Sequence, residues 1–333
     1  MALRRLALVF PGQGSQRVGM GKDLLADWPR IVGDVLEETS EATGLNLRRR
    51  MMEGPADQLT PTHVAQPALL SMSVAVLRVL QHEMELPPVY FALGHSLGEY
   101  SALVAAEAIE FADAVRLVHF RGLAMQRAVA PGVGAMAALI DVKPEDAEVL
   151  CQEAASSTGS VCQVANYNSS KQTVISGDAL AVDAAISYAK ATKKARRAVL
   201  LNVSAPFHCA LMEPAKLELH EQLQQLIQTN KLHEPKVPVV WNIEAEATTK
   251  TVEEIAQVLE KQLVHAVRWS DSVDYCVDKG VDHFLELGVG GVLSGLIRQQ
   301  TSKSDVLSTS CGTTDEIKTF VKNQQHQHQH QQQ

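Results

Sequence analysis

The chain has 333 residues, of which 46% are hydrophobic and 20% are charged, and its formal net charge is -8. This length and composition predict a soluble globular protein with enough chain for a buried core and a second, smaller domain. The acidic balance argues against a protein built to bind nucleic acid or a membrane surface.

The N-terminal segment LRRLALVFPGQGSQ predicts a short buried strand over residues 6–10, followed by a Pro-Gly loop. Because this pattern begins almost at once, we expect no targeting segment in the chain. Gly12 and Gly14 resemble the start of a dinucleotide fingerprint, but Arg17 occupies the third glycine position. The later segment LGVGGVLSGL fails in the same way at Leu293. We therefore reject NAD binding and interpret the first loop as a source of backbone donors, in particular the amide of Gln13.

A second buried strand is predicted over residues 89–93, with a helix from about residue 97. Between them, GHSLG matches the G-x-S-x-G pattern, in which a serine occupies a strained strand-to-helix turn. This context favours Ser96 as a nucleophile, with the amide of Leu97 and the helix dipole available to stabilise an oxyanion. The alternative is a serine that only caps the helix.

The helical pattern over residues 111–127 places an arginine on an apolar face. Ala114, Leu117 and Ala124 align with Arg121 at three- and four-residue steps. A buried guanidinium requires a partner, and its planar fork suits a carboxylate. Two partners stay open at this point, namely an acidic residue of the protein and a carboxylate of the substrate. Arg116 and Arg127 lie on other faces and are expected to be solvated.

Between residues 132 and 204 the pattern changes to strand, helix, strand, strand, helix and strand, which is the βαββαβ order of a ferredoxin-like unit. We therefore predict an α/β fold in which a parallel-sheet, hydrolase-like large domain, residues 1–131 and 205–320, carries an inserted ferredoxin-like small domain, residues 132–204. The segment 321–333 ends in a Gln- and His-rich run without apolar side chains, which predicts a disordered tail.

A serine hydroxyl needs a base, and the sequence offers one directly after the small domain. His208 lies in NVSAPFHCALM at a predicted strand-to-helix junction, with Pro206 at a candidate first helical position. A helix N-terminus disfavours imidazolium, so the ring is expected to stay neutral and able to accept a proton. His119 lies in the middle of a helix and is interpreted as a packed or surface residue.

The five cysteines are odd in number and lack C-x-x-C spacing, which argues against a disulfide framework and a structural zinc site, and favours a reducing compartment. We also expect no membrane insertion, because no apolar run was recognised that approaches the roughly 18 to 20 residues of a membrane helix.

Several motifs occur together in a fixed order: FPGQGSQ, GHSLGEYSAL, an arginine about 25 residues after the serine, VSAPFHCALM, QLVHAVRWSDSV and FLELGVGGVLSGL. This combination closely resembles the malonyl-CoA:acyl-carrier-protein transacylases, over about residues 6–297. The acyltransferase domains of fatty-acid and polyketide synthases share the same plan.

The resemblance implies a set of catalytic roles. Ser96 would attack the thioester carbonyl, and His208 would take its proton and return it to the leaving thiol. The amides of Gln13 and Leu97 would form the oxyanion hole. Arg121 would bind the free carboxylate of the malonyl group.

Three further residues are implied in the same way. The backbone carbonyl of Gln262 would orient the histidine in place of an aspartate. Asn168 matches a family asparagine near the site, although NSSK replaces the usual Ser-Pro-Gly run beside it. Phe207, where bacterial enzymes often have serine, would restrict the space beside the substrate's α-carbon and favour malonyl over methylmalonyl.

The predicted reaction is a ping-pong transfer of malonyl from malonyl-CoA to the phosphopantetheine thiol of acyl carrier protein, supplying extender units for fatty acid synthesis. Neither a metal nor a redox cofactor is expected. Because carrier proteins are acidic, a basic cluster is a candidate docking site, and the alternative is a solvated turn; it comprises Lys193, Lys194, Arg196 and Arg197. The chain resembles the mitochondrial form, which predicts a monomer in the mitochondrial matrix, with the bacterial cytoplasm as the alternative.

Two other classes of function also fit part of the sequence. A serine thioesterase or esterase shares G-x-S-x-G but needs an acidic triad member between the serine and the histidine. Asp178 and Asp183 are the nearest candidates, and both fall in the predicted second helix of the small domain. A carrier-protein-binding scaffold without catalysis would not need the intact serine, histidine and arginine.

Overall fold

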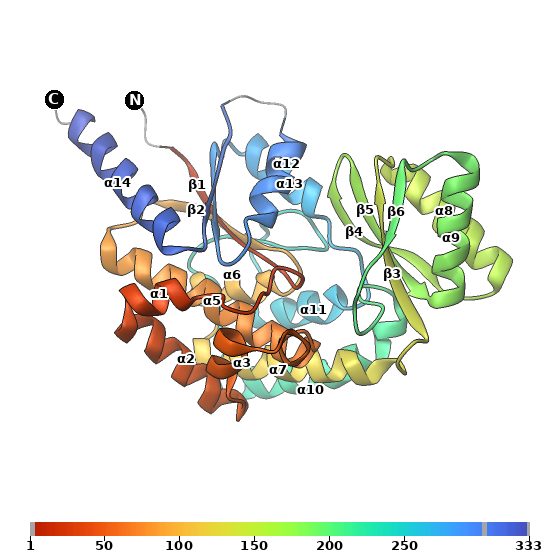
Figure 1. The fold of residues 1–333 in the computed structure, drawn as a ribbon, viewed down its shortest axis with the longest axis horizontal. Helices are drawn as coiled ribbons and strands as arrows, with labels where there is room; N and C mark the ends of the chain where they lie inside the picture. Colours follow the sequence, from red (N-terminus) through yellow and green to blue (C-terminus); the bar gives the residue numbers. More distant parts are fainter. Residues whose placement is uncertain (1–3, 302–304, 332–333) are drawn as a thin grey trace.

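In the computed structural model, which describes residues 4–301 and 305–331, a five-stranded sheet organises the larger part of the chain (Figure 1). Its order is β7-β2-β1-β8-β9, and every neighbouring pair is parallel. The strands are β1 (Leu6–Phe10), β2 (Val89–Gly94), β7 (Val239–Val240), β8 (His283–Leu287) and β9 (Leu307–Cys311). The predicted parallel-sheet α/β fold is thus confirmed. The remaining residues of the predicted large domain and tail, 1–3, 302–304 and 332–333, lie outside the described residues.

The central strand β1 is buried along its whole length because helices cover both faces of the sheet. Leu6, Leu8 and Phe10 point into one apolar cluster, and Ala7 and Val9 point into another. The first cluster is shared with α1 (Lys22–Asp27), α2 (Pro29–Thr43), α3 (Leu47–Glu53), α4 (Ala56–Leu59), α5 (Thr62–Glu83), α6 (Gly98–Ala105), α7 (Phe111–Ala128), α10 (Glu213–Gln228) and α11 (Val252–Gln262). The second is shared with α12 (Trp269–Asp278) and α13 (Val292–Gln300).

The helix α5 corrects the expectation that no run is long and apolar enough for a membrane helix. It has 22 residues, and an 18-residue window within it has a mean hydropathy of 1.4, so the helix is long and apolar enough to cross a membrane. In this fold, however, 89% of that window is buried against the other helices and the sheet. The segment therefore serves as a core helix, and its apolar character on all sides reflects burial on all sides.

A second sheet of four antiparallel strands has the order β4-β5-β3-β6. Its elements are β3 (Gly134–Ile140), α8 (Pro144–Thr158), β4 (Cys162–Ser169), β5 (Gln172–Asp178), α9 (Ala179–Thr192) and β6 (Arg197–Leu200). Ala137 and Leu139 pack on α8 and α9, whereas Met136 and Ala138 belong to the apolar cluster of the large sheet. One face of this sheet thus looks toward the larger part of the chain, as Figure 1 also shows.

The C-terminal segment differs from its prediction. Residues 321–331 continue the helix α14 (Thr314–Gln331), where a disordered tail was expected, so that expectation is wrong for the described part of the segment. Ile317, Phe320 and Val321 are buried and anchor the start of the helix. The Gln- and His-rich run that follows contains neither proline nor glycine, so nothing in it interrupts a helix that packing has already started.

Candidate active site

A cavity of about 630 Å³ lies where the two parts of the chain meet. The carboxyl ends of the adjacent strands β1 and β2 lead into it, which is the usual position for a ligand site in a parallel sheet. Residues from both parts line the cavity: Met136 and Asn166 belong to the small sheet, and the larger part contributes Gln13, Ser96, Leu97, Arg121, Phe207 and His208. The six residues of the larger part were all predicted from the sequence as site residues.

The turn after β2 presents Ser96 in a left-handed backbone conformation, with φ at 52°. The residues two positions before and after it, Gly94 and Gly98, must be glycines. A Cβ on Gly94 would lie 1.9 Å from the backbone of Gly98, and one on Gly98 would lie 2.0 Å from the carbonyl oxygen of Phe10. The amide of Ser96 donates to Oδ1 of Asn242 at 2.7 Å, which holds the turn in place. The strain is therefore built into the backbone and leaves the hydroxyl facing the cavity.

His208 lies against this hydroxyl. Its Nε2 is 2.8 Å from Ser96 Oγ, and its Nδ1 is 2.8 Å from the backbone oxygen of Gln262. A carbonyl can only accept, so it fixes Nδ1 as the protonated nitrogen and leaves Nε2 as the acceptor for the serine proton. Asp178, a triad candidate of the hydrolase alternative, instead accepts from the amide of Val161.

The reason for the neutral histidine differs from the predicted one. His208 lies in a turn with φ at 59°, and the next helix is a 3-10 turn that begins at Ala210, so neither His208 nor Pro206 occupies a helix N-terminus. Burial, and secondarily the charge of Arg121, lowers the pKa of His208 to about 3. The ring is kept neutral by desolvation and a nearby cation, not by a helix dipole.

We expect the imidazole of His208 to stay uncharged from about pH 8 to pH 5, because its pKa of about 3 lies well below the ordinary value for histidine. Histidine ring proton resonances followed by NMR across this range test the prediction, with the spectrum of His208→Asn used for assignment. A titration of the His208 signal centred near pH 6.5 would contradict it.

Arg121 is 1% exposed and reaches the nucleophile. Its Nη2 donates to Ser96 Oγ at 3.2 Å and to Oε1 of Gln262 at 2.9 Å, and its Nη1 donates to Oε1 of Gln66 at 2.9 Å. Within the described residues it forms no ion pair, and its buried Nε has no partner. Of the two partners left open by the sequence, the acidic residue in direct contact is therefore not observed.

Two amides remain for an oxyanion. In the described part of the chain, the backbone N–H groups of Gln13 and Leu97 have no protein acceptor, whereas that of Ser96 is taken by Asn242. The side chain of Gln13 donates to Thr62 Oγ1 at 3.1 Å, which holds its loop against α5. Both free amides belong to residues that line the cavity, as the oxyanion-hole prediction requires.

Asn168 and Phe207 occupy different positions. Asn168 Oδ1 lies 2.8 Å from Nε2 of His95 and lines a neighbouring cavity of about 380 Å³. It therefore fixes the residue before the nucleophile and does not line the cavity at Ser96. Phe207 is buried and lines the main cavity, as Ser96 does.

The basic cluster lies at the far end of the small sheet. Arg197 pairs with Ile140, at the opposite end of β3 from Gly134, which packs against Pro206 in the loop that carries the histidine. Two of its members form ion pairs, Lys194 with Asp146 and Arg196 with Asp141. The surface arginines Arg116 and Arg127 also form exposed ion pairs, as expected for solvated charges.

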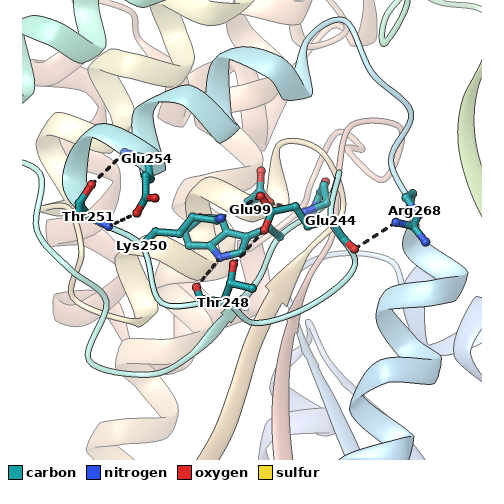
Figure 2. A network of polar contacts seen from close by, with 9 residues as sticks. Glu99, Glu244, Thr248, Lys250, Thr251, Glu254 and Arg268 are labelled. Carbon is teal, nitrogen blue, oxygen red and sulfur yellow. Dashed lines mark hydrogen bonds and ion pairs between the residues drawn. The ribbon is translucent and has the colours of Figure 1, made fainter.

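Three residues that hold the site together were not predicted from the sequence. Gln66 accepts a hydrogen bond from Arg121, Asn242 accepts one from the amide of Ser96, and Glu99 accepts one from the amide of Asn242. Glu99 is fully buried, and burial raises its pKa to about 7. Figure 2 shows it beside Glu244. The available signal was a polar residue inside an apolar run, as in GEYSALVAAEA and VPVVWN.

The described residues contain no cluster of three or more His, Cys, Asp or Glu side chains suited to a metal ion. All five cysteines are free and buried.

A serine on a strained strand-to-helix turn, a neutral histidine on its hydroxyl and two free amides form the equipment of an acyl-transfer enzyme. The chain belongs to the acyl transferase domain family, whose sequence profile matches residues 7–332. It is 45% identical to the malonyl CoA-acyl carrier protein transacylase of Escherichia coli (strain K12), over 89% of this chain and 93% of that one. The corresponding values for the Bacillus subtilis (strain 168) enzyme are 40%, 95% and 96%.

Solved structures agree with these relatives. The malonyl CoA-acyl carrier protein transacylase of Coxiella burnetii superposes with a TM-score of 0.89 at 39% identity, covering 96% of this chain and 97% of that one. A malonyl-transacylase in complex with a type II PKS acyl-carrier protein gives the same TM-score and identity, covering 96% and 99%. The protein is thus an acyltransferase of the malonyl CoA-acyl carrier protein transacylase type. The bacterial relatives are consistent with the cytoplasmic alternative and give no support to the mitochondrial form.

Proposed function

We propose that the protein transfers malonyl from malonyl-CoA to the phosphopantetheine thiol of an acyl carrier protein, through a malonyl ester on Ser96, and so supplies extender units for fatty acid synthesis. The observation that carries this proposal is the 3.2 Å contact between Arg121 Nη2 and Ser96 Oγ inside one cavity. A nucleophile and a guanidinium without a protein carboxylate partner can bind the two ends of one short diacid.

In the first half-reaction, Ser96 Oγ attacks the thioester carbonyl while Nε2 of His208 takes its proton. The amides of Gln13 and Leu97 stabilise the oxyanion, and the carbonyl of Gln262 stabilises the imidazolium through Nδ1–H. The tetrahedral intermediate then breaks its C–S bond, and the imidazolium protonates the leaving CoA thiolate. In the second half-reaction the carrier-protein thiol loses its proton to His208 and attacks the ester carbonyl. The C–O bond then breaks, and the imidazolium returns the proton to Ser96 Oγ.

The carrier protein as partner is supported by the complex of the related malonyl-transacylase. We retain the basic cluster as a docking candidate, with two of its four charges already engaged by aspartates. We also propose that residues 132–204 form a ferredoxin-like domain, that the protein acts as a monomer and that it uses no cofactor. The mitochondrial matrix stays a prediction beside the bacterial cytoplasm.

Charge reversal tests the docking candidate. We expect Lys193→Glu combined with Arg197→Glu to raise the KM for carrier protein several-fold at low salt, because long-range attraction to an acidic partner is lost. The KM for malonyl-CoA should not change. Lys322→Glu, on the exposed side of α14, is the matched control. An unchanged carrier-protein KM would assign the cluster to a solvated turn.

Trapping the intermediate tests the function itself. After brief exposure to malonyl-CoA, peptide mass spectrometry should locate a malonyl ester on Ser96. A phosphopantetheine thiol should then discharge that ester much faster than water does. Faster discharge by water would favour the esterase alternative, and a chain that forms no adduct would favour the scaffold.

A further inference from the structure

A buried carboxylate lies one side chain away from the site's guanidinium. Glu99, in the first turn of α6, accepts from the backbone N–H of Asn242 at 2.7 Å and from Nε2 of Gln262 at 2.5 Å. The same amide of Gln262 turns its Oε1 toward Nη2 of Arg121, at 2.9 Å. The cation and the carboxylate are therefore joined in a chain, with a single amide between them.

We propose that Glu99 is the counter-charge of Arg121, held one amide away by Gln262, so that the buried cation is balanced inside the fold while, among the described residues, no protein carboxylate is bonded directly to its guanidinium. The inference rests on the function proposed above. Glu99 is not among the residues that line the cavity, and it acts as a positioning residue through Gln262.

The hydrogen-bond directions support this assignment. An ionised carboxylate only accepts, and both oxygens of Glu99 receive an N–H donor. Glu99 thereby forces the NH₂ end of the Gln262 amide toward itself and the oxygen end toward Arg121. The reverse orientation would place two donors face to face at the guanidinium. Gln262 Nε2 also donates to the backbone oxygen of Ser96 at 3.0 Å, so the same amide braces the nucleophile.

The surrounding charges leave Arg121 and Glu99 as natural partners. Glu244, the other carboxylate near Glu99, is engaged by Lys250 Nζ at 2.8 Å and by Thr248 Oγ1 at 2.9 Å, and its backbone oxygen accepts from Arg268 (Figure 2). Burial and, to a smaller extent, the charge of Glu244 raise the pKa of Glu99, while its two hydrogen bonds and the charge of Arg121 lower it. On the other side, Arg121 lies 5.3 Å over the ring of Tyr100.

The side-chain amide of Gln262 is the spacer between Glu99 and Arg121, and it meets two opposing requirements. A buried guanidinium without any compensating charge is costly, because it has lost its hydration. A carboxylate bonded directly to it would form a forked pair that a substrate carboxylate would have to displace. One intervening amide keeps the compensation, and the buried Nε of Arg121 has no partner among the residues that the structure describes.

A double-mutant cycle in unfolding tests the counter-charge without using activity. At pH 8, where Glu99 is ionised, Glu99→Gln should destabilise the otherwise unchanged protein strongly, and less than half as much in an Arg121→Met background. Failure of the single variant to fold beside a folded double variant gives the same support. Equal destabilisation in both backgrounds, or failure of both to fold, would reduce Glu99 to a local hydrogen-bond acceptor and overturn the proposal.

Exchanging the two side chains tests the spacing. In the variant Glu99→Gln with Gln262→Glu, the carboxylate contacts Arg121 directly, so the ratio of kcat/KM for malonyl-CoA to that for acetyl-CoA should fall about 10- to 100-fold. Gln262→Glu alone should act in the same direction. Glu286→Gln changes another buried carboxylate, which caps α13, and should leave the ratio unaltered.

The outcomes separate the two proposals. A parent protein without malonyl preference would defeat the proposed function, while the unfolding cycle would still decide on the counter-charge. A parent that prefers malonyl, with an unchanged ratio in the exchanged variant, would overturn only the role of the spacer.

Discussion

Replacement of Ser96 by alanine is expected to lower kcat/KM for malonyl transfer by about four to six orders of magnitude. The hydroxyl receives a hydrogen bond from Arg121 and faces the acceptor nitrogen of His208, so its removal leaves the base without a proton to take. A transfer assay with malonyl-CoA and carrier protein measures the loss. Mass spectrometry of the intact variant should show no acyl adduct.

The control is a variant of His208, the other member of the serine–histidine pair. His208→Ala should cause a loss of similar order, and the double variant should be about as slow as the slower single variant, because the two groups act as a unit. Circular dichroism and thermal unfolding should show that both proteins remain folded. A loss below about tenfold for Ser96→Ala would support the alternative that this serine only caps α6.

Replacement of Arg121 by alanine is expected to lower kcat/KM for malonyl-CoA by about 100-fold and to spare or raise that for acetyl-CoA. Malonyl carries a distal carboxylate that the guanidinium can bind, whereas acetyl does not. Both substrates share the thioester, the serine and the oxyanion hole. Parallel steady-state assays give the ratio of kcat/KM for malonyl-CoA to that for acetyl-CoA, and this ratio tests whether Arg121 selects the substrate.

Arg121→Lys supplies the matched comparison, since it keeps a charge but loses the planar fork and should retain only part of the malonyl preference. Arg121→Met separates charge from volume. Equal losses for malonyl and acetyl in Arg121→Ala would show that the arginine supports the nucleophile and does not select the substrate.

The local parts of the site could be predicted from the sequence. The turn at Ser96 is specified by two glycines within five residues, and the buried face of α7 by the three- and four-residue spacing around Arg121. The strands and helices of the small sheet were predicted from the order of strand and helix patterns over residues 132–204. Each of these signals lies within one short segment, which is where sequence patterns are informative.

The parts that depend on distant segments could not be predicted in this way. Gln66 meets Arg121 across 55 positions, and Asn242 meets Ser96 across 146. A polar residue inside an apolar run marks the residue itself, but nothing local identifies its partner, because each contact joins segments far apart in the chain. The neutral state of His208 was expected for the wrong reason, since the burial and the nearby cation that cause it arise only in the folded chain.

The position of β1 governs when the enzyme can become active during synthesis. This strand precedes the other strands in the sequence, yet it lies between β2 and β8 and pairs with residues 283–286. The loop with Gln13 follows it directly, and the base comes only after the inserted sheet. One edge of β1 therefore stays unpaired during synthesis until residues 283–286 have been made, and the large sheet beside the site can close only then.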